Sequence, residues 1–404
     1  MAENLIDAAK SMVPLIQSSL DRIDSERQLP SELASAMAKK QLFGLYVPKE
    51  LGGPETDPIT AFRVVEEIAQ ADGSVGWCVF NGTAVSSAVA RLSPRAAKEL
   101  FGDPPLVLGS GSARAGGTAK LTEGGYLVTG RWNFLSGIDH SVALFLACRV
   151  IDDNGPVMND DGTPITRTVV IPVAAGEVLN TWTTLGMRGT ASNDAEFVEV
   201  FVPADHTYTR GDPAHYDGPL YTPPESSIVL GWTLSAANTL GMARGAMNSF
   251  VDLATDSGST DSAILLQDRP HIKVVVGECE AMIDSARRYV LDTVESMWEA
   301  QVKQTSELAE RSMRARLAIT HAIRQSIAVV DKLFNAAGTN AIHHSVGLER
   351  FFRDLHVHGQ HISGLSLITS SSAGRSSWGC RRLPRYTHSQ CGPSAIIRKN
   401  QSRP

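Results

Sequence analysis

The chain has few cysteines, and none of them forms a pair of the kind that binds a metal. Its 404 residues contain five cysteines, an odd number, which are spread far apart: Cys78, Cys148, Cys279, Cys380 and Cys391. Structural zinc sites use Cys or His ligands at short spacings, and disulfide frameworks need many cysteines in a short secreted chain. The sequence therefore excludes a Cys-x-x-Cys metal pair and predicts free thiols in a reducing cytoplasm.

Long hydrophobic runs and a strong net charge are also missing. No apolar run approaches the roughly 18–20 residues that span a bilayer, and no basic segment followed by an apolar one opens the chain, so we expect neither a membrane segment nor a signal peptide. The net charge of −6 gives no reason to expect nucleic-acid binding. No Gly-x-Gly-x-x-Gly follows a strand-like segment, so an NAD(P)H-binding fingerprint is absent.

The spacing of apolar residues divides the chain into helical, β and helical regions. Helical periodicity marks the first hundred residues, for example over residues 58–71. Short β-branched or aromatic runs between Gly, Asp, Asn and Pro from about residue 105 to 210 predict an antiparallel β domain. Long amphipathic helices from about residue 226 are typical of a bundle. We expect a helical domain at 1–104, a β domain at 105–215 and a helical bundle at 216–367.

The last segment, from residue 368 to 404, is basic and has no apolar period. No Asp or Glu follows Asp354, and Arg and Lys gather after Arg375. Composition alone favours an irregular basic tail that is disordered or lies along the surface. Two alternatives are a reading frame that shifts near residue 368 and a tail with a specific function.

Three segments resemble the acyl-CoA dehydrogenase superfamily. PKELGG at 48–53 resembles the end of its N-terminal helical domain, and GYLVTGRWNFLSGIDHS at 125–141 resembles the strand that lines its flavin. LGMRGTASNDAEFVEVFVP at 185–203 resembles a third element of the superfamily almost letter for letter. The resemblance covers about residues 5–365. It implies an α+β fold with an N-terminal helical domain, a central antiparallel β domain and a C-terminal four-helix bundle, assembled as a homotetramer.

The C-terminal histidines decide which branch of the superfamily the chain resembles. A dehydrogenase needs a carboxylate to remove the proton next to a thioester, but FFRDLHVHGQHISGLSL offers histidines and no acid beyond Asp354. This pattern is similar to the two-component flavin-dependent monooxygenases that act on hydroxyphenylacetate, steroid-derived phenols and dibenzothiophene.

The monooxygenase branch implies a definite reaction and partners. Reduced FAD or FMN comes from a separate NAD(P)H:flavin reductase, and one atom of O₂ enters a small aromatic or polycyclic substrate through a C4a-hydroperoxyflavin. Some members carry a phenol-activating His where this chain has Val85, so a simple phenol is less expected. Two alternatives are an acyl-CoA dehydrogenase or flavin oxidase, and a catalytically inert relative used for binding.

The resemblance assigns two catalytic residues, His361 and Ser136. The matching His lies beside the reactive edge of the flavin, where an imidazole can donate to the bound oxygen or accept a substrate proton. The matching hydroxyl lies near flavin N5. The alternatives are a structural histidine and a turn serine before Gly137. His356, His358 and His361 do not share one helical face, and suitable partner ligands are missing, so no metal site is expected.

The other candidate flavin contacts are Trp132, Asn133, Phe134, Arg188, Thr190, Ser192, Arg269 and Ser112. Strand alternation places Trp132 and Phe134 on one face. Arg188 has the alternative role of holding the β domain against the helices. Arg269 resembles a position that reaches the flavin phosphate of a neighbouring subunit, although a solvated helix start is an equal alternative. Ser112 lies in a Gly-rich segment without a phosphate-binding fingerprint.

Overall fold

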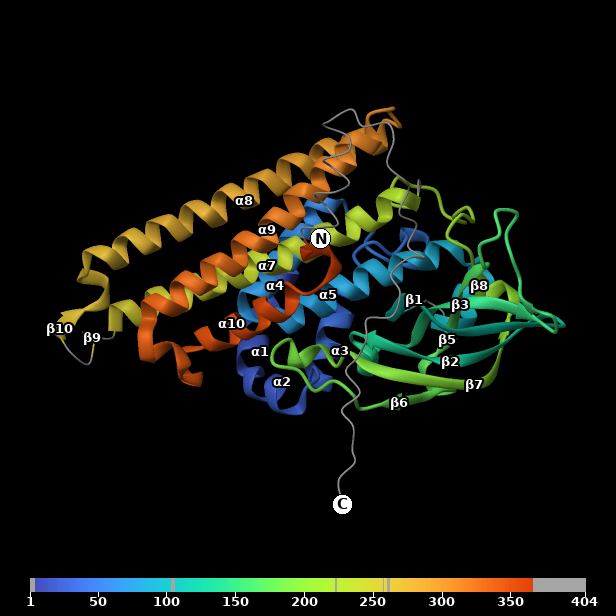
Figure 1. Ribbon diagram of the computed structural model, residues 1–404, viewed down its shortest axis with the longest axis horizontal. Coiled ribbons are helices and arrows are strands. Elements are labelled where there is room, and N and C mark those ends of the chain that lie inside the picture. Colours follow the sequence, from blue (N-terminus) through green and yellow to red (C-terminus); the bar gives the residue numbers. More distant parts are fainter. Residues whose placement is uncertain (1–3, 103–105, 222–223, 257, 260–261, 366–404) are drawn as a thin grey trace, which may run out of the picture.

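The computed structural model describes residues 4–102, 106–221, 224–256, 258–259 and 262–365. The basic tail predicted at 368–404 lies outside the described residues. The order of the elements is helices, sheet, helices, and the long helices extend away from the sheet (Figure 1). The expected fold class is therefore confirmed, with one correction to the sheet.

The N-terminal region is helical. Its α-helices are α1 (Leu5–Ser18), α2 (Leu20–Glu26), α3 (Ser31–Lys39), α4 (Pro58–Ala71), α5 (Gly73–Ser86) and α6 (Pro94–Phe101). The start of α4 shows why the sequence begins a helix there. The Asp57 side chain accepts from the N–H groups of Ile59 and Thr60, and Pro58 occupies the first turn, where its missing N–H costs nothing.

Helix α5 packs between α4, α7 (Pro224–Asp256) and the sheet (Figure 1). Its small residues make this possible. A Cβ built at Gly76 would lie 2.2 Å from Asn238 Oδ1 and 2.8 Å from the Ala69 Cβ, so only glycine permits this approach. The N-terminus of α5 is capped by Asp72, whose side chain accepts from Val75 N.

The central sheet is mixed, whereas we expected an antiparallel one. Its strands are β1 (Gly109–Thr122), β2 (Gly125–Leu135), β3 (Ala143–Asp152), β4 (Gly155–Pro156), β5 (Thr166–Pro172), β6 (Glu177–Leu179), β7 (Asn193–Pro203) and β8 (Thr207–Tyr208), in the order β6-β7-β2-β1-β3-β5-β8 with β4 on β3. The β1–β3 pair is parallel, because the chain leaves the β1–β2 hairpin at the end where β1 begins and adds β3 to the other side of β1.

The described part of the C-terminal region has three long helices and one short helix: α7, α8 (Pro270–Val302), α9 (Leu308–Ala337) and α10 (Leu348–His358). A small ribbon, β9 (Gly258–Ser259) with β10 (Ser262–Leu265), joins α7 to α8. Helix α10 packs against α7 and α9, which brings the C-terminal histidines back toward α5 and the sheet.

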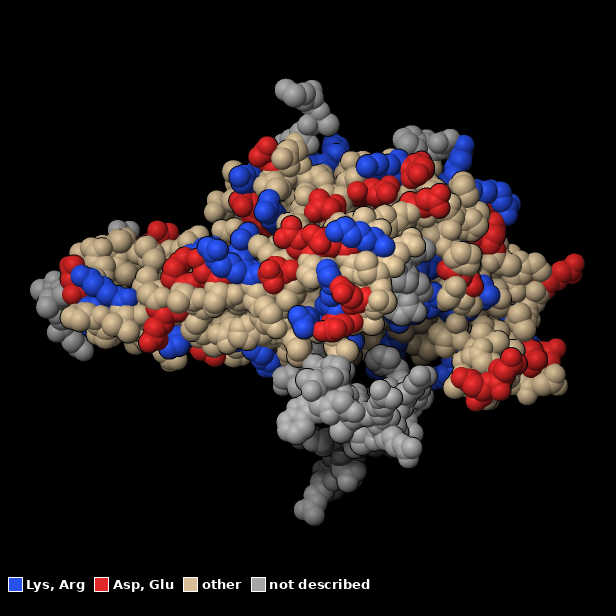
Figure 2. Space-filling view, turned by 90° about the horizontal axis from the view of Figure 1, so that it is seen from above, with Lys and Arg blue, Asp and Glu red and all other residues tan. Residues whose placement is uncertain are grey.

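The surface carries both signs of charge. Lys and Arg alternate with Asp and Glu over the face seen in Figure 2, in agreement with the small net charge of −6. None of the described helices combines the length and the hydrophobicity of a membrane span.

Candidate active site

The indole of Trp77 is the point where the two predicted catalytic residues meet. Trp77 lies on α5, and its Nε1–H donates to Ser136 Oγ, just beyond the end of β2, at 2.9 Å. The rings of His358 and His361 meet the same indole edge-on, with centroids 4.7 and 5.2 Å away. Phe80, one turn along α5, packs on the Trp77 and His361 rings. Three distant segments therefore converge on one aromatic side chain.

A chain of hydrogen bonds runs from Trp77 through three hydroxyl groups. Ser136 Oγ lies 2.7 Å from Ser192 Oγ, and Ser192 Oγ lies 2.7 Å from Thr190 Oγ1. Thr190 Oγ1 donates to the Met187 carbonyl oxygen at 2.9 Å. Each hydroxyl has one proton, and the Met187 carbonyl can only accept. Ser192 therefore donates to Thr190, and Ser136 donates to Ser192.

This direction fixes what Ser136 can offer a ligand. The proton of Ser136 is used by Ser192, and one acceptor position of Ser136 Oγ is filled by Trp77. A hydroxyl oxygen has two acceptor positions, so one is left. In this arrangement Ser136 accepts from a ligand N–H and does not donate. The 3₁₀ turn η5 (Arg188–Thr190) and the start of β7 hold Thr190 and Ser192 in place.

A second set of hydrogen bonds joins the two histidines. His358 contacts Asn238 Nδ2 through Nδ1 at 3.2 Å and Ser235 Oγ through Nε2 at 2.8 Å. Ser235 Oγ lies 2.9 Å from Ser363 Oγ, which lies 2.7 Å from His361 Nδ1. Asn238 and Ser235 are one turn apart on α7, and Ser363 lies in the 3₁₀ turn η10 (Ile362–Gly364).

Both histidines are neutral at ordinary pH. Burial lowers the pKa of His361 to about 4. Burial, and then the neighbouring His361, lowers the pKa of His358 well below its usual range. His356 faces elsewhere, because its Nε2 pairs with Asp331 on α9 at 2.9 Å. In agreement with the sequence, the three histidines do not form one cluster.

Two buried carboxyl groups tie the site elements together. Asp354 on α10 accepts from Met187 N at 2.5 Å, and Asp72 caps α5. Both side chains are almost completely buried. Burial, followed by the charge of Asp72, raises the pKa of Asp354 to about 7. Asp354 therefore positions the loop that carries Thr190 and Ser192, and its carboxyl group is not exposed as a base for substrate.

This pKa shift gives a testable pH dependence. Between the unfolded pKa near 3.8 and the folded pKa near 7, the folded protein binds more protons, so stability falls as pH rises. Asp354→Asn mimics the protonated group. We expect this variant to match the wild type at pH 4 and to exceed it by about 1–3 kcal/mol at pH 8. Thermal unfolding at the two pH values measures this difference.

The control for that experiment is Asp292→Asn, on an exposed position of α8. We expect it to show no such change between pH 4 and pH 8. A wild-type-like pH profile for Asp354→Asn would contradict the protonated state assigned to Asp354.

The structure corrects the expected alternation along β2. Trp132 is 1% exposed and donates from Nε1 to the Ala147 carbonyl at 2.8 Å, inside the core of the sheet. Phe134 is 64% exposed and meets Trp182 edge-on, with ring centroids 6.0 Å apart. The two rings face different environments because the register shifts between Trp132 and Leu135 and Phe134 has a φ of 60°. Asn133 between them is partly buried.

The remaining candidates lie at three separate places. Arg188 pairs with Asp24 Oδ2 at 2.9 Å, which corresponds to the alternative role of joining the β domain to the helices. Ser112 is partly buried on β1, opposite Leu146. Arg269 precedes α8 at the β9–β10 end of the molecule, far from the sheet (Figure 1). Within one chain, Arg269 therefore does not meet Ser136.

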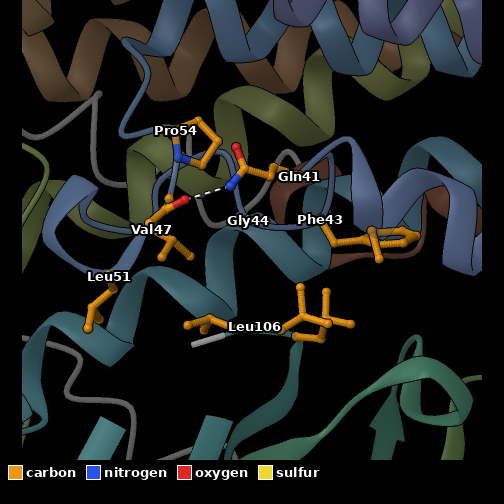
Figure 3. A pocket seen from close by; sticks show the side chains of 12 residues that line it. Gln41, Phe43, Gly44, Val47, Leu51, Pro54 and Leu106 are labelled. Atoms are coloured by element: carbon orange, nitrogen blue, oxygen red, sulfur yellow. Dashed lines mark hydrogen bonds between the residues drawn. The ribbon is translucent and has the colours of Figure 1, made fainter. Parts of the chain in front are cut away.

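Two hollows lie outside the group formed by Trp77, Phe80, Ser136, His358 and His361. A mostly apolar one between the N-terminal region and the start of β1, lined by Phe43, Val47, Leu51 and Leu106, has a volume of about 40 Å³ (Figure 3). A cavity that holds benzene has roughly 150 Å³, so an aromatic substrate does not fit there. The other hollow is polar, has a volume of about 190 Å³, and includes Trp182, the ring that Phe134 contacts.

These features fit a flat flavin ring better than they fit a metal. Phe134 and Leu185 are apolar side chains that are 64% and 61% exposed. Ser136, two residues after Phe134, keeps one open acceptor position. Among the described residues, the one group with metal-ligand geometry is Glu99, Asp205 and His206. There Arg95 already forms ion pairs with both acids, so this surface group is a salt-bridge cluster.

Five residues of the site were not predicted from the sequence: Trp77, Asn81, Ser235, Asn238 and Ser363. Asn81 donates from Nδ2 to the Ser136 carbonyl at 2.9 Å, which makes α5 a second support for Ser136. The signal in the sequence was weak, because a Trp, two Asn and two Ser on helices and turns have no diagnostic spacing.

Comparisons with known proteins cover almost the whole chain. The acyl-CoA dehydrogenase N-terminal domain matches residues 7–103, and the acyl-CoA dehydrogenase C-terminal domain matches residues 233–364. The chain is 30% identical to the flavin-dependent monooxygenase oxygenase subunit HsaA of Mycobacterium tuberculosis, over 88% of this chain and 90% of that protein. It is 28% identical to the indole-3-acetate monooxygenase of Acinetobacter baumannii, over 90% and 91%.

Solved structures agree with these similarities. The crystal structure of the HsaA monooxygenase from M. tuberculosis has a TM-score of 0.83 at 28% identity, and covers 94% of this chain and 97% of that one. XiaF from Streptomyces sp., in complex with FADH₂ and glycerol, also has a TM-score of 0.83, at 25% identity and with coverage of 93% and 95%.

Proposed function

The chain belongs to the acyl-CoA dehydrogenase family and is a flavin-dependent monooxygenase, and from this premise we propose how its residues hold a reduced flavin and an aromatic substrate. The observation that carries the proposal is the convergence of Ser136 and His361 on Trp77. A bound reduced flavin would react with O₂ and supply the oxygen atom. The residues of the chain bind and orient the reactants and exclude water from them.

Ser136 receives the flavin. Its open acceptor position suits the N5–H group of a reduced flavin, whereas N5 of an oxidised flavin has no hydrogen to donate. Thr190 and Ser192 act through Ser136 by keeping its proton turned away. Phe134, with its exposed ring, supports the flat face of the flavin, and Asn133 and Ser112 remain proposed contacts on neighbouring strand positions.

The substrate lies against aromatic side chains. Trp77, Phe80 and His361 form a group of rings whose centroids are 4.9–6.3 Å apart, a spacing typical of aromatic contacts. HsaA and indole-3-acetate monooxygenase are both monooxygenases, and the second is named for an aromatic substrate. We therefore propose that a small aromatic or polycyclic compound stacks there beside the flavin.

The reduced flavin comes from a separate reductase. HsaA is named as an oxygenase subunit, and this sequence has no NAD(P)H-binding fingerprint. XiaF binds FADH₂, and reduced FMN is the alternative here. We also propose a cytoplasmic homotetramer, because the cysteines of the described residues are free and because Arg269 lies too far from Ser136 to serve the flavin of its own chain.

An anaerobic binding experiment tests this function. The protein is titrated with reduced FAD and with reduced FMN, mixed with oxygenated buffer, and followed by stopped-flow absorbance. We expect bound flavin to return to the oxidised spectrum roughly tenfold or more slowly than free flavin, because the site excludes water. Reoxidation at the rate of free flavin would reject the proposal, and bleaching of oxidised flavin by an acyl thioester would favour the dehydrogenase alternative.

A further inference from the structure

We propose that Asn238, His358, Ser235 and Ser363 form a directional relay that holds His361 in the tautomer with its proton on Nε2, so that His361 is a hydrogen-bond donor and not a proton acceptor. The inference deepens the proposed function and rests on it for the group that His361 meets. The tautomer itself is a property of the chain and is measurable without flavin or substrate.

The direction of the relay starts at Asn238. Its Nδ2 lies 3.2 Å from the Gly73 carbonyl oxygen, which can only accept. The amide nitrogen must therefore face Gly73, because the opposite orientation would bring two oxygens together. The same nitrogen lies 3.2 Å from His358 Nδ1. Nδ1 of His358 is consequently the acceptor, and a neutral His358 carries its proton on Nε2.

The hydrogen bonds that follow run in the same direction. His358 Nε2–H donates to Ser235 Oγ at 2.8 Å. Ser235 then uses its single proton toward Ser363 Oγ at 2.9 Å, and Ser363 uses its own toward His361 Nδ1 at 2.7 Å. With Nδ1 occupied as an acceptor, a neutral His361 has its proton on Nε2.

The far end of the relay supports the same direction independently. The backbone N–H of Ser363, which can only donate, points to His361 Nδ1 at 3.4 Å. The Thr320 hydroxyl donates to the Ser363 carbonyl at 2.9 Å and holds this turn against α9. A proton on Nδ1 would therefore oppose two donors from Ser363, one from its side chain and one from its backbone.

Burial keeps the relay from reversing. Ser235, Asn238 and Ser363 are 0% exposed, and His358 is 2% exposed. Reversal of the whole relay would leave a donor facing a donor at Asn238. Reversal from Ser235 onward would take the Ser235 proton away from Ser363 and turn a protonated Nδ1 of His361 toward the Ser363 N–H. An unpaired buried polar group costs about 1–3 kcal/mol. Among the described residues, Nε2 of His361 has no hydrogen-bond partner, so its N–H is available to a ligand.

The consequence is a choice between the two roles that the sequence left open for His361. Through Nε2–H it donates to an oxygen atom, on the flavin or on the substrate. It does not take a proton from a phenol or an indole unless the bonds from Ser235 to His361 reverse, which would turn a protonated Nδ1 toward the Ser363 N–H. Asn238, His358, Ser235 and Ser363 are thus positioning residues, which act through His361.

Solid-state NMR of protein labelled with ¹⁵N-histidine tests the relay, and the His361→Gln difference spectrum identifies the signals of His361. We expect a single His361 tautomer with hydrogen on Nε2. In Ser363→Ala and in Asn238→Leu we expect a second signal from Nδ1–H, because the donor to Nδ1 or the anchor of the relay is lost. Ser326→Ala is the matched control, since this buried serine bonds only its own helix, at Ala322.

A wild-type His361 signal from Nδ1–H would overturn the proposal, even if neither Ser363→Ala nor Asn238→Leu folds. So would a single unchanged tautomer in both variants. Binding of reduced flavin by the wild type, measured separately, distinguishes this failure from failure of the proposed function. If His361 has the expected tautomer but the wild type does not bind reduced flavin, the proposed function is rejected and the relay is kept. If the wild type binds reduced flavin but His361 carries its proton on Nδ1, only the relay is rejected.

Discussion

His361→Ala is expected to lower the yield of oxygenated product per flavin oxidised by about 100-fold. A positioned proton donor accelerates the step that it assists by roughly 10²–10⁴-fold. Binding of reduced flavin stays close to the wild-type value, since Ser136 and its hydroxyl chain are untouched. The flavin would still be reoxidised, but the oxygen would leave as hydrogen peroxide. Product and peroxide are measured together in single-turnover reactions with reduced flavin and an aromatic substrate.

The donor role predicts which replacement restores activity. The amide nitrogen of His361→Gln reaches farther than that of His361→Asn and lies closer to the position of Nε2, so we expect Gln to recover more of the yield. The matched control is His356→Ala, which removes a histidine that pairs with Asp331 away from Trp77. Equal losses in His356→Ala and His361→Ala would contradict a specific role for His361.

The low pKa of His361 also predicts the pH profile of the wild type. Since burial lowers this pKa to about 4, His361 stays neutral, with its Nε2–H intact, throughout pH 5–8. We therefore expect no change in yield that is attributable to His361 in this range. A loss of yield with a midpoint near 6.5 that disappears in His361→Gln would contradict the buried, neutral state.

Ser136→Ala is expected to weaken binding of reduced flavin by about tenfold, the equivalent of one hydrogen bond of about 1–1.5 kcal/mol. Binding of oxidised flavin changes much less, because the wild-type Ser136 proton is already used by Ser192. The ratio of the two affinities therefore falls toward one. Anaerobic titrations with reduced flavin and aerobic titrations with oxidised flavin give this ratio.

The control for Ser136→Ala is Ser141→Ala. Ser141 follows the same turn, and its hydroxyl donates to the Gly137 carbonyl at 2.9 Å, outside the hydroxyl chain. We expect Ser141→Ala to keep the wild-type preference for reduced flavin. If Ser136→Ala kept that preference as well, Ser136 would not be the N5 partner.

Patterns in the sequence are enough to predict the fold class, the family and the neighbourhood of the site. Local signals sufficed for helix α4, where Asp57 and Pro58 begin a helix without help from distant residues. The LGMRGT element indicated the acyl-CoA dehydrogenase superfamily, and the C-terminal histidines indicated its flavin-dependent monooxygenase branch. The segment at 125–141 and those histidines indicated Ser136 and His361, which are 225 positions apart and which both contact Trp77.

How those residues work depends on contacts that form only in the folded chain. Strand periodicity could not reveal the parallel β1–β3 pair or the left-handed backbone at Phe134, because both depend on which strands become neighbours. The direction of the Ser136 chain is set by the Met187 carbonyl, and that of the His361 relay by the Gly73 carbonyl at one end and the Ser363 N–H at the other. A carbonyl can only accept, but which hydroxyl or imidazole it orders follows from packing in three dimensions and leaves no spacing in the sequence.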